Sequence, residues 1–380
     1  MFRVSHFMQE LITPSPVGKR RNPPGPVVIW TLIRRCNLAC KHCYSVSADK
    51  DFNGELSTTE IKAVMDDLRA FRVPVLILSG GEPLLRPDIF EIAAAAKAKG
   101  FYTALSSNGT LIDEAMAERV AAAKFDYVGI SIDGIGVTHD RFRALDGAYV
   151  RSLAGIRACI ARGVKVGLRF TMTMDNFTEL PEVMALMEAE GVAKFYFSHL
   201  NYAGRGNKNR LDDATIQVTR SAMDLLFETA WSHAEAGRER EFVTGNNDAD
   251  GPYFLDWVRR RHPGHAPHIA AKLAQWGGNA SGVNVANIDN LGWVHPDTMW
   301  GHHRLGNVRE RLFSAIWADT SDPLMAGLKQ HPRPVTGRCG ICTHLSICNG
   351  NTRVRAERVT GDPWAEDPGC YLDDQEIGLA

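Results

Sequence analysis

The chain has 380 residues, of which 44% are hydrophobic, and its 43 Lys and Arg are balanced by 44 Asp and Glu. This length exceeds one ordinary domain and suits a barrel with an appendage, and the composition allows a substantial core. A net charge of −1 gives no overall field that would draw the protein to nucleic acid or to a membrane surface.

The chain opens with a leader, residues 1–26, that is rich in proline towards its end. The leader lacks the apolar segment of a signal peptide, and nowhere do about 18 apolar residues follow one another, as a membrane helix requires. We therefore expect a cytoplasmic protein without a membrane partner.

Six apolar, β-rich runs alternate with helical patterns after the leader. The runs cover residues 27–33, 73–79, 101–107, 127–133, 164–172 and 193–200. Between them, apolar residues recur at spacings of three and four, as in amphipathic helices. Repeated strand–helix units with nearly continuous apolar strands predict a parallel sheet covered by helices. Because a closed barrel has eight units, the predicted α/β fold is an open, partial (β/α)6 barrel over residues 27–238.

The pattern changes in the last third of the chain. A polar, basic stretch, NYAGRGNKNRLDD, precedes a long helix near residues 213–237. From about residue 240, short helical patterns mix with Gly, Asn, His and Pro. We interpret residues 239–380 as a separate C-terminal module, which would cover the lateral gap of the open barrel.

Cysteines fall into two clusters and one single position, Cys159, which is simplest as a buried core residue. In a reducing cytosol, clustered thiols are more often metal ligands than disulfides. Cys36, Cys40 and Cys43 follow the first strand with CxxxCxxC spacing. Iron–sulfur clusters normally take four cysteines, so three thiolates would leave one iron for a ligand from elsewhere. A zinc site or three incidental thiols are the alternatives.

Unusual residues also follow the carboxyl ends of the next strands, which form the active-site face of a β/α barrel. They are SGGEP at 79–83, SNG at 107–109 and SIDG at 131–134. CxxxCxxC after the first strand, followed by GGEP after the second, resembles the radical S-adenosylmethionine (SAM) superfamily. The resemblance implies that the three cysteines hold a [4Fe–4S] cluster whose fourth iron binds SAM. One electron from the cluster would cleave SAM to a 5′-deoxyadenosyl radical that takes a hydrogen atom from the substrate.

The resemblance also implies a set of cofactor contacts. In the family, an aromatic ring lies near the adenine of SAM, and the backbone of the GGEP segment approaches closely and binds the SAM amino group. Polar residues at the strand ends line the ribose and the methionine part, and a guanidinium could pair with the SAM carboxylate. The residues at these positions are His42, Gly80, Gly81, Glu82, Pro83, Ser107, Asn108, Ser131, Asp133 and Arg169. For the last five, a strand-end turn, a cap or a structural salt bridge is the alternative.

Cys339, Cys342, Cys348 and Cys370 form a second set. Four thiolates suffice for a tetrahedral zinc ion or for a [4Fe–4S] cluster. The surrounding segments resemble the SPASM or twitch extension of radical SAM proteins, which carries auxiliary iron–sulfur clusters, and this favours iron. In two-cluster extensions the segment like GWVHPD usually ends in cysteine, whereas this chain has Asp297. We therefore expect two [4Fe–4S] clusters in total.

Over essentially its whole length the chain resembles the heme d1 biosynthesis proteins and their relatives in the alternative heme pathway. The resemblance implies an iron tetrapyrrole substrate of the siroheme type, 12,18-didecarboxysiroheme, whose propionate side chains are attacked. It also implies an electron donor such as flavodoxin or ferredoxin, and we expect a monomer. Decarboxylation of coproheme by a heme synthase, SPASM-type peptide modification and a non-catalytic scaffold are the alternatives.

Candidate substrate contacts follow the sixth strand. A polycarboxylate macrocycle needs cations near the mouth of the barrel, where substrate-binding loops lie, and a histidine could ligate its iron. These candidates are His199, Arg205, Lys208 and Arg210. A solvated loop and a structural histidine are the alternatives.

Overall fold

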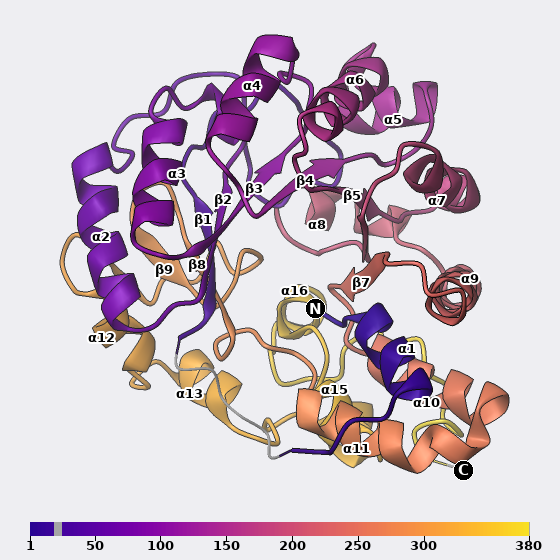
Figure 1. Ribbon diagram of the computed structural model, residues 1–380. Helices are drawn as coiled ribbons and strands as arrows, with labels where there is room; N and C mark the ends of the chain where they lie inside the picture. Colours follow the sequence, from indigo (N-terminus) through magenta and orange to yellow (C-terminus); the bar gives the residue numbers. More distant parts are fainter. Residues whose placement is uncertain (19–24, 380) are drawn as a thin grey trace.

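The strands of the computed structural model join into one sheet (Figure 1). Within the described residues, 1–18 and 25–379, the sheet has ten strands in the order β10-β9-β8-β1-β2-β3-β4-β5-β6-β7. Neighbours from β8 through β1 to β7 run parallel, whereas β9 and β10 are antiparallel. The bounds are β1 Val27–Thr31, β2 Val75–Ser79, β3 Tyr102–Ser107, β4 Tyr127–Ser131, β5 Val166–Thr171, β6 Lys194–Ser198, β7 Glu241–Gly245, β8 Val285–Ile288, β9 Trp293–His295 and β10 Gly306–Asn307.

Helices cover the outer face of this sheet and build much of the C-terminal part. Their starts follow local sequence signals; α2, for example, begins with a capping box formed by Ser57 and Glu60. None of the helices within the described ranges is long and apolar enough to cross a membrane. The bounds are α1 Val4–Ile12, α2 Thr58–Ala70, α3 Ile89–Ala98, α4 Glu114–Ala122, α5 Val137–Arg143, α6 Ala148–Ala161, α7 Leu180–Ala189, α8 Gly204–Lys208, α9 Ile216–Glu235, α10 Asp250–Arg261, α11 Ala266–Trp276, α12 Phe313–Ala318, α13 Pro323–Lys329, α14 Gly337–Ile341, α15 Leu345–Cys348 and α16 Arg353–Thr360.

All six predicted strands are present, and the long helix near 213–237 is α9. The prediction missed the strands that extend the sheet at both edges. β7 pairs with β6, for example Val243 with Tyr196, and β8 pairs with β1 through Asn287 and Ile29. Residues assigned to a separate C-terminal module therefore complete the barrel wall. β7 has five residues and β8 has four, and polar residues flank both strands in the sequence. Their apolar pattern is therefore weak.

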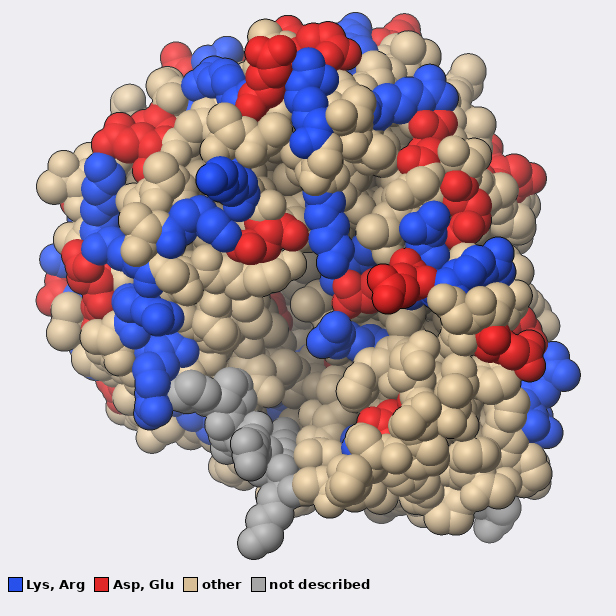
Figure 2. Space-filling model, in the orientation of Figure 1, with Lys and Arg blue, Asp and Glu red and all other residues tan. Residues whose placement is uncertain are grey.

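The two faces of the sheet differ in burial. Side chains that face the helices, such as Val128, Phe195 and Phe197, are fully buried, whereas alternate residues such as Tyr127 and Tyr196 face the other way and are partly exposed. Inward side chains fill the interior of an ordinary β/α barrel, so partial exposure indicates a hollow lumen here. Figure 2 shows the molecule hollowed near its centre, between the strand–helix units and the C-terminal helices.

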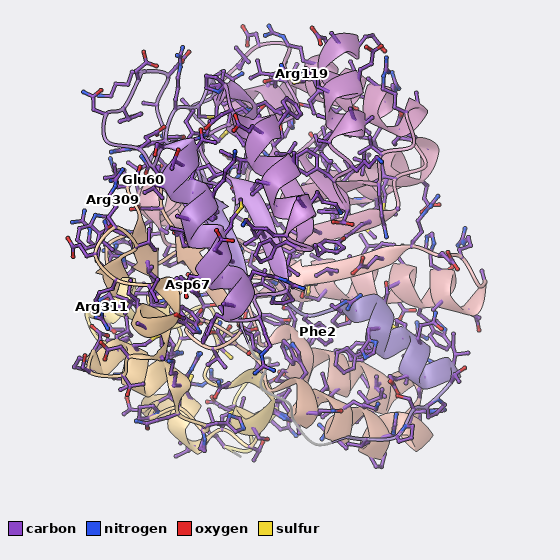
Figure 3. All side chains as sticks on the ribbon, turned by 60° about the vertical axis from the view of Figure 1, so that its left-hand side comes forward. Phe2, Glu60, Asp67, Arg119, Arg309 and Arg311 are labelled. Carbon is purple, nitrogen blue, oxygen red and sulfur yellow. The ribbon has the colours of Figure 1, made fainter. Side chains whose placement is uncertain are left out.

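Side chains from the C-terminal part fix α2 against the sheet edge (Figure 3). Arg309 Nε donates to Glu60 Oε1 at 2.6 Å. Ser314, at the start of α12, donates to Asp67 from its backbone N at 2.9 Å and from its hydroxyl at 2.7 Å. The C-terminal part is therefore bonded to the outer helix layer as well as to β1.

The first residues of the leader belong to the folded structure. Phe2 and Thr244 exchange two backbone hydrogen bonds of 2.8 Å, which cover the outer edge of β7. The Phe2 ring packs against Phe254 and Trp276 at centroid distances of 5.5 and 5.2 Å. Exposed strand edges invite unwanted pairing, and this segment closes the edge. α1 follows and lies against α9 and β7.

Glu10 anchors α1 to α11, and its replacement by Gln tests this anchor. Burial by itself would raise the pKa of Glu10, but hydrogen bonds from Ser15, His268 and Lys272 outweigh burial and lower the pKa to about 2. A carboxyl whose folded pKa lies below its unfolded value stabilises the fold above the unfolded pKa and loses this effect as pH falls. We expect Glu10→Gln to lower the unfolding free energy by roughly 1–2 kcal/mol at pH 7.

Urea unfolding at pH 7 and at about pH 3.5 measures this effect. The difference between wild type and variant should shrink at the lower pH, because this pH lies below the unfolded pKa of Glu10, so the unfolded wild type gains a proton there while the folded protein stays charged. Glu239→Gln, at an exposed position, is the matched control. A difference that is the same at both pH values would contradict the charge-based anchor.

Candidate active site

The first cysteine set lies in a buried loop after β1. Cys36 and Cys40 are 6% and 7% exposed, and Cys43 is partly buried. Burial raises the pKa of Cys36 to about 12. Burial acts in the same direction on Cys43, but hydrogen bonds with the Ser45 and Ser47 hydroxyls, at 3.3 and 3.6 Å, help to lower its pKa. All three are free thiols on one short segment, so they can serve one ligand together.

The segment after β6 holds this loop. Arg205 donates from Nε to Cys40 O at 2.7 Å, from Nη1 to Ser47 O at 2.9 Å, and from its backbone N to Cys43 O at 2.8 Å. The backbones approach so closely that a Cβ on Gly204 would lie 2.5 Å from Cys43 O. Buried carbonyl groups need partners, and this one segment supplies three of them.

These contacts differ from the predicted role of the segment after β6, in which its cations bind the substrate. Arg205 donates through Nε and Nη1 to carbonyl oxygens of the cysteine loop, while its Nη2 is buried without a hydrogen-bond partner among the described residues. Lys208 is exposed, and the exposed Arg210 donates to Asn207 O at 3.4 Å. α8 therefore positions the cysteine loop, and its remaining cations lie at the surface.

The glycines after β2 let the chain pass directly over the start of the cysteine loop. A Cβ on Gly80 would lie 2.6 Å from Ile33 O, and one on Gly81 would overlap Arg35 O, so neither position accepts a side chain. Gly81 N donates to Ile33 O at 2.7 Å. Pro83 then begins a short 3₁₀ turn, Pro83–Leu85. The loops after β1 and β2 are thereby bonded to each other.

Glu82 ties these loops to the end of β3. Its side chain is fully buried and accepts from Ser107 Oγ at 2.9 Å and from Asn108 N at 2.8 Å. Burial raises the pKa of Glu82 to about 7, although these hydrogen bonds favour the charged form. Asn108 Nδ2 donates to Asn37 Oδ1 at 2.9 Å, next to Cys36. The structure thus brings together the first three predicted strand-end motifs.

Asp133 and His42 meet beside the same loop. Asp133 is fully buried and pairs with Arg143, a residue that the sequence motifs do not single out. His42 Nε2 lies 3.8 Å from Asp133 Oδ2, and its ring centroid lies 4.6 Å from that of Phe142. Among the described residues, His42 Nδ1 and Arg143 Nε are buried without a hydrogen-bond partner. Such orphaned polar atoms beside three thiols fit a site for a polar cofactor.

Ser131 and Arg169 lie on the inner face of the sheet, where they are partly exposed. Their Cα atoms are partners in the β4–β5 register. The Arg169 guanidinium crosses to β3, where it donates to the Ser106 hydroxyl, and it also lies 5.4 Å from the Tyr196 ring centroid. Arg169 therefore presents a positive charge to the lumen just below the cysteine loop.

His199 does not fit the predicted role of substrate contact or iron ligand. It is 4% exposed, and its Nε2 lies 3.0 and 3.2 Å from the two carboxylate oxygens of Asp250. Asp250 also accepts from Tyr371 Oη at 2.7 Å and from the Thr244 hydroxyl. This buried network, in which His199 pairs with Asp250, joins the end of β6 to α10 and to the C-terminal segment.

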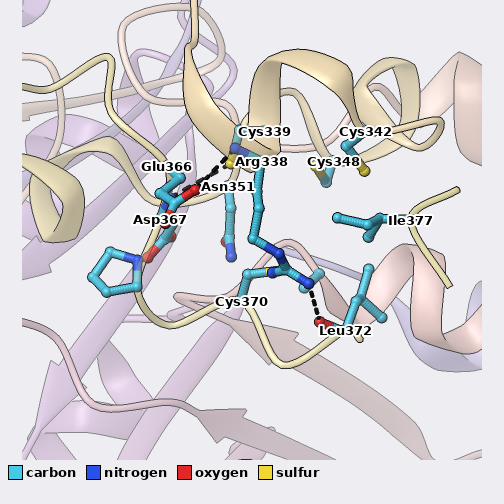
Figure 4. Close-up of a pocket in the computed structure, with 12 residues that line it drawn as sticks. Arg338, Cys339, Cys342, Cys348, Asn351, Glu366, Asp367, Cys370, Leu372 and Ile377 are labelled. Atoms are coloured by element: carbon cyan, nitrogen blue, oxygen red, sulfur yellow. Dashed lines mark hydrogen bonds between the residues drawn. The ribbon is translucent and has the colours of Figure 1, made fainter. Parts of the chain in front are cut away.

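The second cysteine set surrounds a cavity of about 150 Å³ in the C-terminal part (Figure 4). Asp367 N donates to Cys339 Sγ at 3.5 Å, and burial raises the pKa of Cys370 to about 11. Arg338 donates to Leu372 O at 2.9 Å and so links α14 to the C-terminal segment. The lining residues include Cys339, Cys342, Cys348, Cys370, Arg338, Asp367, Leu372 and Ile377.

The size of this cavity bears on what the second set can hold. A zinc ion needs its sulfur ligands at about 2.3 Å from one centre. The cavity exceeds the roughly 10–15 Å³ that suffices for one water. A space of about 150 Å³ lined by four thiols has room for a cluster of several atoms.

Comparison with known proteins places the chain in context. A family model described as the radical SAM superfamily matches residues 30–187. A pre-heme d1 synthase from Dinoroseobacter shibae is 55% identical over 382 residues, with 100% of this chain and 94% of that protein covered. An Fe-coproporphyrin III synthase from Methanosarcina barkeri is 45% identical over 356 residues, with 93% and 89% covered. The similarity thus spans both cysteine sets.

Among solved structures, Streptococcus suis SuiB bound to precursor peptide SuiA is similar with a TM-score of 0.73 at 15% identity, covering 92% of this chain and 76% of that one. At this identity the likeness concerns the fold alone. It confirms the predicted partial barrel with a C-terminal extension.

Replacing Arg205 tests how the cysteine loop is held. Arg205→Gln removes two side-chain hydrogen bonds from a charged donor, each worth about 1.5–3 kcal/mol. We expect the variant to retain less iron and acid-labile sulfide after anaerobic reconstitution, and to lose them faster to a chelator. Arg210→Gln, at an exposed position of the same segment, is the control. If wild type, Arg205→Gln and Arg210→Gln retain iron equally, the cysteine loop keeps its conformation without Arg205.

Proposed function

Since this chain is a member of the radical SAM superfamily, we propose that it is an enzyme of heme d1 biosynthesis that acts on the propionate side chains of an iron tetrapyrrole. The observation that carries the proposal is the 55% identity to a pre-heme d1 synthase over the whole chain. In this proposal the substrate is 12,18-didecarboxysiroheme, as the resemblance to heme d1 biosynthesis proteins implies. A flavodoxin or ferredoxin would deliver the electron to a monomeric, cytoplasmic enzyme.

The residues around the cysteine loop suit the cofactors of the family. Cys36, Cys40 and Cys43 would hold the [4Fe–4S] cluster. When bound, the cluster and SAM supply the 5′-deoxyadenosyl radical that removes a hydrogen atom from the substrate. The chain's own part is to hold the cofactors in a buried, hydrogen-bonded frame that excludes water. The residues proposed to contact SAM are His42, Gly80, Gly81, Glu82, Pro83, Ser107, Asn108, Ser131, Asp133 and Arg169.

The lumen wall is shaped for a large, flat ligand. A Cβ on Gly167 of β5 would overlap the Tyr127 hydroxyl, and one on Gly245 of β7 would overlap the Tyr196 hydroxyl. Both tyrosines therefore lie along the wall, over a glycine of the neighbouring strand, and do not project across the lumen. Lys194 lies over the Tyr127 ring at 5.1 Å and Arg169 over the Tyr196 ring at 5.4 Å, so the wall combines flat rings with cations, which suits a planar polycarboxylate.

Arg169 adds a positive charge to this wall. Its Cδ would lie 2.9 Å from a Cβ on Gly129, so this glycine lets the side chain lie flat on β4 as well. A guanidinium binds a carboxylate through paired, charge-assisted hydrogen bonds. Arg169 would thus face a carboxylate of SAM or of the substrate in the lumen.

The second cysteine set would hold an auxiliary [4Fe–4S] cluster, which makes two clusters in total. All four thiols would then serve as protein ligands, so this cluster is suited to relaying electrons or orienting the substrate. Asp297 stands where a further cluster would need a cysteine; it is partly buried and accepts from the Ser281 hydroxyl and from Met299 N at 2.7 Å.

The second candidate function is a reaction on a coproporphyrin-type substrate. It is favoured by the 30% identity over 351 residues to an AdoMet-dependent heme synthase from Methanosarcina barkeri. Both candidates need a planar polycarboxylate in the lumen, so the wall geometry does not separate them.

The test is an anaerobic assay of reconstituted, reduced protein with SAM and either iron tetrapyrrole, followed by mass spectrometry of 5′-deoxyadenosine and of the tetrapyrrole. Stimulated deoxyadenosine with mass loss or oxidation of didecarboxysiroheme is the expected result. The same result with iron coproporphyrin alone would favour the second function. Cleavage that no tetrapyrrole stimulates would contradict both and turn the search to peptides.

Cysteine variants test the two cluster assignments in the same assay. Cys40→Ala should abolish SAM cleavage, because the cluster would lose one of three thiolates. Cys370→Ala should remove the second cluster yet leave some cleavage. Cys159→Ala, which removes a fully buried thiol within α6, should retain both clusters. Full turnover by Cys40→Ala would refute the site.

Gly167→Ala tests the lumen wall. The added Cβ should push the Tyr127 ring into the lumen and weaken tetrapyrrole binding by about tenfold, or about 1.4 kcal/mol, without a change in SAM affinity. Titration followed by absorption spectroscopy measures both affinities. Gly264→Ala is the control, because a Cβ there meets nothing within 4 Å. Unchanged tetrapyrrole affinity in Gly167→Ala would contradict binding of the substrate against this wall.

A further inference from the structure

Arg143 places a buried guanidinium against the cysteine loop. It is the last residue of α5, and the chain turns after it at Ala144 in a left-handed conformation. Its side chain is 7% exposed. The backbone fixes the approach, because Lys41 N in the cysteine loop donates to Phe142 O at 3.2 Å.

The three nitrogen atoms of Arg143 have different surroundings. Nη1 donates to Cys40 Sγ at 3.5 Å, and Nη2 donates to Asp133. Nε is buried without a hydrogen-bond partner in the described part of the chain. Asp133 is itself held in place, because its other oxygen accepts from Thr171 N at 2.7 Å. The ion pair therefore directs one edge of the guanidinium at the sulfur.

The environment strengthens this interaction. Cys36 and Cys40 pack with Leu38 and Leu145 in an apolar cluster. Charges act more strongly in such a medium than in water. Burying a guanidinium is costly unless negative groups compensate its charge. Asp133 binds Nη2, so the Cys40 sulfur is the group that faces Nη1.

We infer that Arg143 sets the reduction potential of the cluster held by Cys36, Cys40 and Cys43. Its charge and its N–H···S bond stabilise the reduced cluster, which carries one more negative charge than the oxidised cluster, so reduction becomes easier. Net charge and hydrogen bonds to sulfur are what tune iron–sulfur potentials. The electron comes from an external one-electron donor, and no covalent bond forms or breaks. Arg143 acts through Cys40 and is a positioning residue.

Arg143→Gln in the full-length, reconstituted protein tests the inference by a redox titration with dithionite, followed by electron paramagnetic resonance. The signal of this cluster is the one that changes when SAM is added. At the wild-type midpoint potential, the ratio of reduced to oxidised cluster should fall about tenfold, which corresponds to a midpoint about 59 mV more negative. Arg157→Gln, whose side chain is 61% exposed and pairs with Glu190 on the surface, should leave the ratio unchanged.

Arg143→Lys keeps the charge without the fork and should stay within about threefold of the wild-type ratio. An unchanged midpoint in Arg143→Gln overturns the inference. Loss of the cluster from both variants overturns it as well, because Arg143 would then retain the cluster and not tune it. The readout needs no tetrapyrrole, so it stands apart from the test of the proposed substrate.

Discussion

The catalytic end of this protein depends on one constraint: a short buried loop must turn three sulfur atoms inward while its backbone carbonyls find partners elsewhere. The loop cannot meet this requirement alone. Arg205 donates to three of its carbonyls, and Gly81 and Glu82 N bond the backbone that leads into it. Asn108 approaches from the end of β3 and Arg143 from the end of α5. The positions of the sulfurs are therefore a property of the barrel as a whole.

This frame separates two tasks along the barrel axis. Loops at the carboxyl ends of the strands supply thiols and polar groups, whereas the wall below them is kept open by glycines. Ordinary packing would fill that space with inward side chains; here Tyr127 and Tyr196 lie over Gly167 and Gly245. The C-terminal part contributes to the open wall, because β7 and β8 extend the sheet.

Local patterns in the sequence predicted the strands, the strand-end motifs and both cysteine sets, because periodicity and motif spacing are properties of neighbouring residues. Long-range partners could not be predicted in this way. Arg205 looked like a substrate contact, yet its partners lie about 160 positions earlier, and His199 is occupied by Asp250 from α10. Arg143 stands in a plain helical segment, HDRFR, and only the fold brings it to Cys40. β7 is flanked by polar residues and β8 has only four residues, so neither stands out in the sequence without its partner strand.

The pairing of β1 with β8 has a consequence for biosynthesis. β1 leads directly into the cysteine loop, and one of its edges is completed only by residues 285–288, with Asn287 Nδ2 donating to Ile29 O at 2.7 Å. A ribosome delivers about 5–20 residues per second, so this edge waits many seconds for its neighbour. Contacts of such sequence separation also form slowly. The nascent chain therefore displays the thiols of the cysteine loop beside an open strand edge until β8 has been made and the sheet closes.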